Sequence, residues 1–154
     1  MKATKMVLTL ALCLVGVVVC YAADPNMGSW KLNDAKSKFS TSAIKNTSVV
    51  YEPAGDQVKV TTDGTTGDGK PVHTEWTGKF DGKDYPVTGD PSADTRSYKK
   101  VDDHTLDVTN KKDGKVTASA HIMVSADGKS RTVTMHGTTA DGKKVSSTGV
   151  YDKQ

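Results

Sequence analysis

Cysteine is scarce in this chain of 154 residues, because its only two copies are Cys13 and Cys20. Residues 23–154 contain none, which excludes a disulfide framework, thiol catalysis and cysteine-ligated metals from that part of the chain. Arginine is scarce as well: of the 21 basic residues only two are arginine, Arg96 and Arg131. An arginine in a chain that otherwise uses lysine is a candidate for a specific role, because its planar guanidinium binds carboxylates in a way that an ammonium group does not.

The N-terminal segment differs in composition from everything that follows it. It begins with two lysines, Lys2 and Lys5, continues as an apolar run over residues 6–19, and ends in small residues around Ala22. This order is typical of a secretory signal peptide, and an uncleaved anchor or a lipoprotein is the alternative. We predict a signal peptide over residues 1–22, cleavage after Ala22, a single domain over residues 23–154, and a secreted or periplasmic location.

Strong charge of either sign is also absent. The formal net charge is +3, and removal of the predicted signal peptide lowers it by two. Bulk electrostatics therefore give no reason to expect nucleic acid or an anionic membrane surface as a partner. No membrane span is predicted after the signal peptide, and the oligomeric state is left open.

No helical periodicity of any length follows the signal peptide, whereas the tripeptide Asp-Gly-Lys occurs five times. Its copies lie at 68–70, 81–83, 113–115, 127–129 and 141–143. Asp-Gly between two alternating runs predicts a β-hairpin with a type I′ turn, in which both central residues have positive φ. We therefore expect each copy to connect two antiparallel strands.

Alternation of apolar and polar residues predicts ten strands. They lie at about 30–33, 47–53, 57–63, 71–80, 84–88, 94–101, 105–110, 115–125, 130–137 and 145–152. Many short strands without crossover helices predict an all-β fold, an antiparallel up-and-down β-barrel joined by Asp-Gly hairpins, with a β-sandwich as the alternative. The segment 34–46 has neither period, and we interpret it as a loop with Phe39 packed inward, or as a helical turn.

Large aliphatic side chains are few for a β-barrel of this size. Beyond the signal peptide the leucines are Leu32 and Leu106 and the isoleucines are Ile44 and Ile122. One face of the strands is nevertheless apolar, with the run Val116, Ala118, Ala120, Ile122 and Val124 as an example. A barrel of about eight strands is just filled by its side chains. Ten strands with smaller side chains therefore predict either an interior cavity or a flattened barrel.

Two short stretches at the ends of the domain carry a resemblance to a known group. Gly28-Ser29-Trp30-Lys31-Leu32 is similar to the Gly-x-Trp first strand of the calycins, and Val150-Tyr151-Asp152-Lys153 to the closing strand of fatty-acid-binding proteins. The resemblance implies a lipocalin-like barrel with a ligand inside and Trp30 as the plug of its closed end. Two features depart from the group: residues 34–46 lack its helix pair, and its closing Arg-x-Tyr is Gly149-Val150-Tyr151 in this chain. Residues 81–91 are similar to small secreted bacterial proteins, which implies a bacterial source.

Familiar catalytic and metal-binding motifs are missing. The sequence has no Gly-x-Ser-x-Gly nucleophile elbow and no phosphate-binding loop, and the Asp/Gly loop at 63–68 lacks the spacing of a calcium loop. His73 and Glu75 are neighbours on one strand face and could form a metal or acid/base pair, but by parity that face and His121 are exposed. We predict no catalytic residues, no metal and no cofactor.

The two arginines are the most informative candidates for a binding site. Parity places Arg131 on the buried face with Val133 and Met135, and Arg96 on the face of Tyr98. An inward arginine near a barrel mouth can orient an anionic ligand, with aromatic side chains as the apolar wall. The alternative is a pair of exposed arginines beside turns. The predicted ligand-binding residues are Trp76, Arg96, Tyr98, Arg131, Met135 and Tyr151.

These observations favour a secreted, non-enzymatic protein that binds a small, mostly apolar or amphipathic ligand inside a β-barrel. The alternative is an interaction or structural domain of the cell envelope with a filled interior and an exposed apolar patch or an unpaired edge. An enzyme of unknown type is the third hypothesis.

Overall fold

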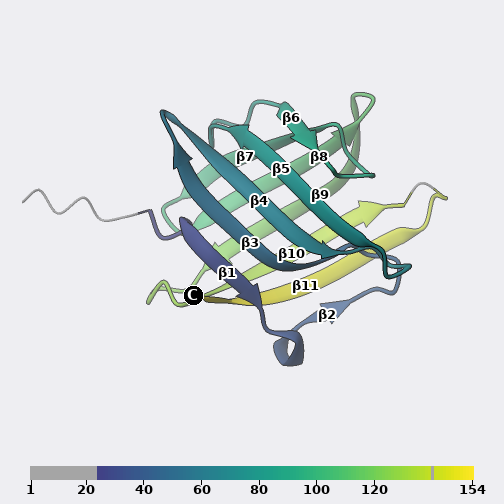
Figure 1. Ribbon diagram of the computed structural model, residues 1–154, viewed down its shortest axis with the longest axis horizontal. Helices are drawn as coiled ribbons and strands as arrows, with labels where there is room; N and C mark the ends of the chain where they lie inside the picture. The colour runs from purple at the N-terminus through teal and green to yellow at the C-terminus, as the bar shows by residue number, and fades with distance from the viewer. Residues whose placement is uncertain (1–23, 140) are drawn as a thin grey trace, which may run out of the picture.

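The computed structural model describes residues 24–139 and 141–154. The predicted signal peptide lies outside the described residues. Within them the chain forms eleven β-strands and one short 3-10 helix (Figure 1). In chain order they are β1 (Gly28–Leu32), η1 (Asp34–Lys36), β2 (Lys38–Phe39), β3 (Lys45–Ala54), β4 (Gln57–Thr65), β5 (Pro71–Gly78), β6 (Tyr85–Thr88), β7 (Thr95–Asp102), β8 (Thr105–Lys112), β9 (Lys115–Val124), β10 (Ser130–Thr138) and β11 (Lys144–Lys153).

The strands form one closed antiparallel barrel. Sequential strands pair from β3 to β11, and β1 pairs with β3 on one side and β11 on the other, with Leu32 opposite Tyr151. Ten strands make the barrel, and β2 adds to β11 as an extra short strand, with Phe39 opposite Ser147. Closure satisfies the backbone groups that an open sheet would leave at its edges. The predicted up-and-down barrel is confirmed, and the sandwich alternative is wrong.

The turn type predicted for the Asp-Gly repeats is correct at only one of them. Of the non-glycine residues described, Asp113 alone has a positive φ, 49°, and it is followed by Gly114 at 73°. In the other four copies only the glycine has a positive φ. At 68–70 the turn begins earlier, at Thr66, whose N–H donates to the carbonyl of Lys70 over 2.8 Å. In all four of these copies the left-handed conformation falls on glycine, where it causes no steric strain.

The segment 34–46 is not the simple loop of the preferred interpretation. Asn33 caps η1 with its side chain, which accepts from the N–H of Lys36, and the short strand β2 follows. Phe39 is only half-buried, whereas Ala43 is buried at 5% exposure. β1 pairs with β11 only over residues 151–153, at the end of β11. The segment 34–46 covers an earlier part of β11, where β2 pairs with Ser147 and Thr148.

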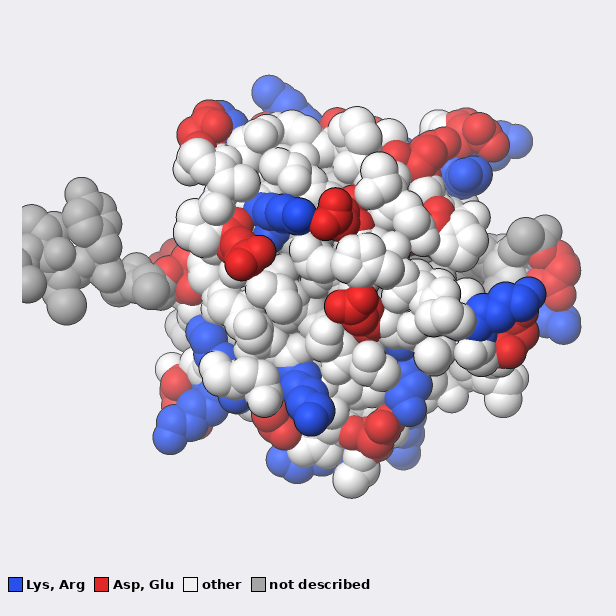
Figure 2. All heavy atoms as spheres, viewed as in Figure 1, with Lys and Arg blue, Asp and Glu red and all other residues white. Residues whose placement is uncertain are grey.

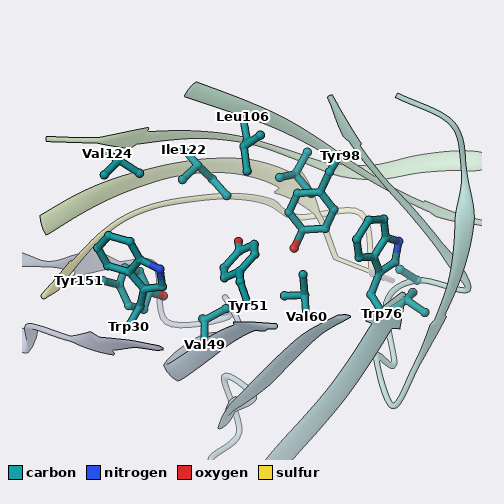
Figure 3. Close-up of a cluster of buried hydrophobic side chains, with 13 residues drawn as sticks. Trp30, Val49, Tyr51, Val60, Trp76, Tyr98, Leu106, Ile122, Val124 and Tyr151 are labelled. Carbon is teal, nitrogen blue, oxygen red and sulfur yellow. The ribbon is translucent and has the colours of Figure 1, made fainter. Parts of the chain in front are cut away.

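The hydrophobic core lies inside the barrel and extends from Trp30 to Trp76. Figure 3 shows Trp30 beside Tyr151 at one side of the cluster, Trp76 at the other, and Tyr51 and Tyr98 between them. One predicted core residue is exposed: Val116 is 62% accessible. The reason is a register shift between β8 and β9 at Asn110 and Lys111, which breaks the alternation that parity assumes.

The two ends of the barrel differ. At one end, which we call the closed end, residues 24–27 pack under the core: Asn26 is fully buried and its carbonyl accepts a 3.0 Å hydrogen bond from Trp30 Nε1. At the other end, which we call the mouth, lie the 40–44 segment, the loops around 66–70 and 89–94, and residues 138 and 139. The C-terminus lies at the closed end (Figure 1).

Candidate ligand-binding interior

Three spaces follow one another from the mouth toward the closed end. A recess of about 670 Å³ lies among the mouth segments, an upper cavity of about 100 Å³ lies below it, and an inner cavity of about 80 Å³ lies deepest. Neighbouring spaces share walls. Ser42, Ser92 and Thr117 line both the recess and the upper cavity, and Thr62, Asn110 and Met135 line both the upper and the inner cavity. The interior therefore consists of three adjoining spaces that become smaller from the mouth toward the closed end.

The upper cavity has a polar wall held in place by internal hydrogen bonds. Arg96 Nη2 donates to Asp90 Oδ2 over 2.8 Å, and Arg96 Nε donates to Asn110 Oδ1 over 2.7 Å. The hydroxyls of Thr62 and Thr74 are bonded to each other at 2.7 Å. These side chains are preorganised, since each already has a partner that fixes its rotamer.

Asp90 reaches the interior because its loop folds back into the mouth. Its carboxylate accepts from the N–H of Ser92 at 2.8 Å and from the Ser92 hydroxyl at 2.6 Å, in addition to Arg96. Gly89 precedes it with a φ of 77°, and a Cβ there would lie 1.9 Å from the carbonyl oxygen of His73. A glycine is required at that close approach, and it sets the direction in which the loop enters.

The inner cavity contains a buried arginine without a counter-ion among the residues that the structure describes. Arg131 is 2% exposed, and neither Nε nor Nη1 has a hydrogen-bond partner there. The guanidinium carbon lies 4.8 Å from the ring centre of Trp30 and 5.0 Å from those of Tyr51 and Tyr151. The aromatic faces attract its positive charge, but they leave its in-plane N–H groups unused.

Two phenols of the inner cavity, Tyr98 and Tyr151, are neutral at physiological pH. Burial raises the pKa of Tyr151 to about 12, although the charge of Arg131 opposes this. Burial also raises the pKa of Tyr98 well above its usual value. Tyr151 uses its hydroxyl to donate to the backbone carbonyl of Asn46 over 3.0 Å. These phenols therefore provide hydroxyl groups and apolar surface, and no negative charge.

The residues proposed from the sequence are brought together with one exception. Five of the six line the inner cavity: Arg96, Tyr98, Arg131, Met135 and Tyr151. Trp76 does not, since its ring packs against Tyr98 at 4.6 Å and its Nε1 donates to the carbonyl of Arg96 over 2.8 Å. It belongs to the core rather than to a cavity wall. Trp30 lies at the closed end with 1% exposure.

Both arginines are buried, so the exposed alternative is wrong. Arg96 is 8% accessible and lies near the mouth, but Arg131 lies at the opposite, closed end. Sequence reasoning missed Asp90, Asn110 and Tyr51 as parts of the site. Asp90 lies in Gly89-Asp90-Pro91, which has the composition of an ordinary turn. Tyr51 could have been found, because it shares a strand face with the apolar Val49.

The histidines on the outer wall form simple surface pairs. His73 Nδ1 lies 2.7 Å from Asp63 Oδ1, and His121 Nδ1 lies 2.7 Å from Asp107 Oδ1, with both rings about half exposed. The separation between His73 Nε2 and Glu75 is 3.9 Å. Among residues 24–139 and 141–154 no group of three or more His, Cys, Asp or Glu side chains could hold a metal ion.

The outer surface carries no patch of one charge on the face in view, where basic and acidic side chains are interspersed (Figure 2). Several form exposed pairs, such as Lys59 with Glu75 at 2.7 Å and Lys111 with Asp84 at 2.7 Å. In the part of the chain that the structure describes, no helix is both long and apolar enough to cross a membrane.

Among known proteins, this chain is similar to solved structures of β-barrels at low sequence identity. No protein-family model matches the chain, and no curated protein is similar to it. The similar solved structures include a redesigned β-barrel, mFAP1, bound to DFHBI (19% identity, TM-score 0.45, 83% of this chain and 96% of that chain). They also include EF1p2_mFAP2b bound to DFHBI (16%, TM-score 0.47, 86% and 97%) and a de novo designed fluorescence-activating β-barrel (13%, TM-score 0.43, 86% and 97%). Likeness at this level describes the strand arrangement and says nothing about function.

Proposed function

We propose that this chain is a binding protein that holds a small molecule inside its barrel and admits it through the mouth. The observation that carries the proposal is the column of three adjoining spaces, which leads from the recess at Ser42 and Ser92 to the buried Arg131. A concave interior with apolar walls and a few convergent polar groups is the usual form of a small-molecule site.

The dimensions of the interior favour a compact ligand. The upper and inner cavities, about 100 and 80 Å³, are on the scale of the roughly 150 Å³ engineered cavity that holds benzene. Valine, isoleucine and methionine side chains supply the apolar wall, and Arg96, Asn110 and Thr62 supply polar groups. An amphipathic molecule of a few ring or chain atoms suits this lining better than a wholly apolar one, and it has room to extend into the recess.

We also propose that the protein acts outside the cytoplasm. The two lysines, the apolar run and the small residues of the N-terminal segment support this location. The rival hypothesis of an interaction domain with a filled interior has less support. The interior has cavities, and the exposed large hydrophobic side chains among the described residues are Val101, Val116 and Met123, the last two at opposite ends of β9.

Native mass spectrometry of the protein, purified gently from the periplasm or medium of its own source, tests the proposal. We expect an adduct of small mass that is lost on denaturation. Ala118→Leu fills the upper cavity and should abolish the adduct, whereas Ser119→Leu changes the next, outward residue of β9 and should keep it. A bare mass, together with no thermal shift from a library of small molecules, would overturn the proposal.

A further inference from the structure

We propose that Arg131 is an anion receptor and that the inner cavity takes the carboxylate of a compact organic acid. This rests on the proposed function, because it names the class of ligand that the same interior binds. The observation behind it is the positive charge of Arg131, which no acidic side chain among the described residues neutralises. Arg131 forms no ion pair within 4.0 Å among the described residues, and its Nε and Nη1 have no partner.

The other two buried charged side chains among the described residues, Asp90 and Arg96, form an ion pair with each other. Asp90 is the one buried carboxylate in residues 24–139 and 141–154, and it is paired with Arg96 at 2.8 Å. Arg96 also lines the inner cavity, but its Nε and Nη2 are occupied by Asn110 and Asp90. The lining of the inner cavity therefore carries an excess of one positive charge, located on Arg131.

This charge cannot be removed by titration. A guanidinium remains protonated at any pH that the protein meets, and the raised pKa of Tyr151, about 12, keeps that phenol neutral beside it. An unpaired buried charge is costly, and an orphan buried donor is a reason to look for a missing ligand. The charge balance is completed by an anion that comes from outside the chain.

A carboxylate fits the available groups better than a multiply charged anion. It carries one negative charge to match the one unpaired guanidinium, and carboxylate oxygens are strong acceptors for guanidinium N–H groups. Apolar side chains line much of the remaining wall: Val49, Val108, Ile122 and Val133. A volume of about 80 Å³, with about 100 Å³ above it, holds a small ring or branched chain. The acid is therefore compact, with an apolar body directed toward the mouth.

The test compares a set of compact carboxylic acids, such as benzoate, with their primary amides, which have nearly the same shape and no charge. Isothermal titration calorimetry on the full mature protein should give at least about tenfold tighter binding for the acids, since charge-assisted bonds to an arginine are the stronger kind. Arg131→Met should remove that preference while leaving the amides bound. Lys129→Met removes a charge from an exposed residue two positions away and should keep it.

A second measurement needs no variant and is independent of whether Arg131→Met folds. The chain has two arginines, so a ¹⁵N spectrum of the Nε–H groups contains two resonances, and Arg96 Nε is already bonded to Asn110. Acids should move the Arg131 resonance, and amides should not. Equal binding of acids and amides would overturn the anion inference and leave the proposed function standing. Binding of neither series, with no co-purifying adduct, would overturn both.

Discussion

Asp90 and Arg96 form an ion pair at 2.8 Å in which the two side chains are 4% and 9% exposed. The pair joins the loop between β6 and β7 to the wall of the barrel, and Asn110 Oδ1 accepts from the neighbouring donor of the same guanidinium, Arg96 Nε, at 2.7 Å. Because the pair is buried, each member depends on the other for its charge balance. The mouth is therefore held in shape by an interaction between a loop and a strand.

Replacement of Asp90 by Asn should destabilise the protein by about 3–5 kcal/mol, since breaking a buried pair leaves Arg96 without a counter-charge. Urea unfolding followed by tryptophan fluorescence measures the change. Asp56→Asn is the matched control, because Asp56 pairs with Lys79 on the surface with 79% of its side chain exposed. Exposed pairs contribute little, so this variant should unfold as the wild type does. Equal effects of the two variants would contradict the assignment.

The surface pair of His73 and Asp63 should be visible in a pH titration. The hydrogen bond that His73 donates to the Asp63 carboxylate holds the pKa of His73 above its usual 6.5, and the smaller effect of desolvation opposes it. A raised folded-state pKa means that the pair stabilises the folded protein fully below pH about 6.5 and that this contribution is lost as pH rises through the folded pKa. NMR titration of the imidazole should give a value above 6.5, and Asp63→Asn should return it toward 6.5. An unchanged pKa in that variant would exclude Asp63 as the cause.

The strand order could be predicted from the sequence because it depends on local signals. Alternation with period two and the Asp-Gly turns are properties of a few neighbouring residues, and they fix antiparallel pairing without any knowledge of distant contacts. Two local predictions failed: the short strand β2 was missed, and the turn type was wrong where Thr66, Ser125 and Thr139 close longer hairpins around the Asp-Gly pair.

The depth of a residue inside the barrel could not be predicted in the same way. Parity correctly places Arg131 inward, but its height along the barrel axis depends on the tilt and stagger of all ten strands. The sequence therefore predicts it near the mouth, whereas it lies at the closed end, beside Trp30. Asp90 illustrates a second limit, since a turn residue becomes an interior one only when its loop folds back onto Arg96.

Cleavage of the N-terminal segment should leave Ala23 as the first residue. The small residues Cys20 and Ala22 occupy the positions that signal peptidase recognises, whereas cleavage one residue later would put Tyr21 in one of them. Edman sequencing or intact mass of protein recovered from the periplasm or medium measures the new terminus. Retention of Met1 in the exported protein would instead support an uncleaved anchor.

Replacement of Arg131 by Met should stabilise the protein in the absence of ligand. The wild-type side chain keeps two donor nitrogens, Nε and Nη1, buried without partners among the described residues, and an unsatisfied buried polar group costs about 1–3 kcal/mol. Met is flexible enough to fill the space among Trp30, Tyr51 and Tyr151, so it should recover much of the packing. The loss of the cation–π contacts works in the opposite direction but is the smaller effect, at about 0.5–2 kcal/mol. Thermal unfolding of ligand-stripped protein should show a higher Tm for Arg131→Met and a lower one for Arg96→Met, which breaks a satisfied pair. A lower Tm for both would mean that Arg131 contributes to the fold itself, in which case its burial would not point to a ligand.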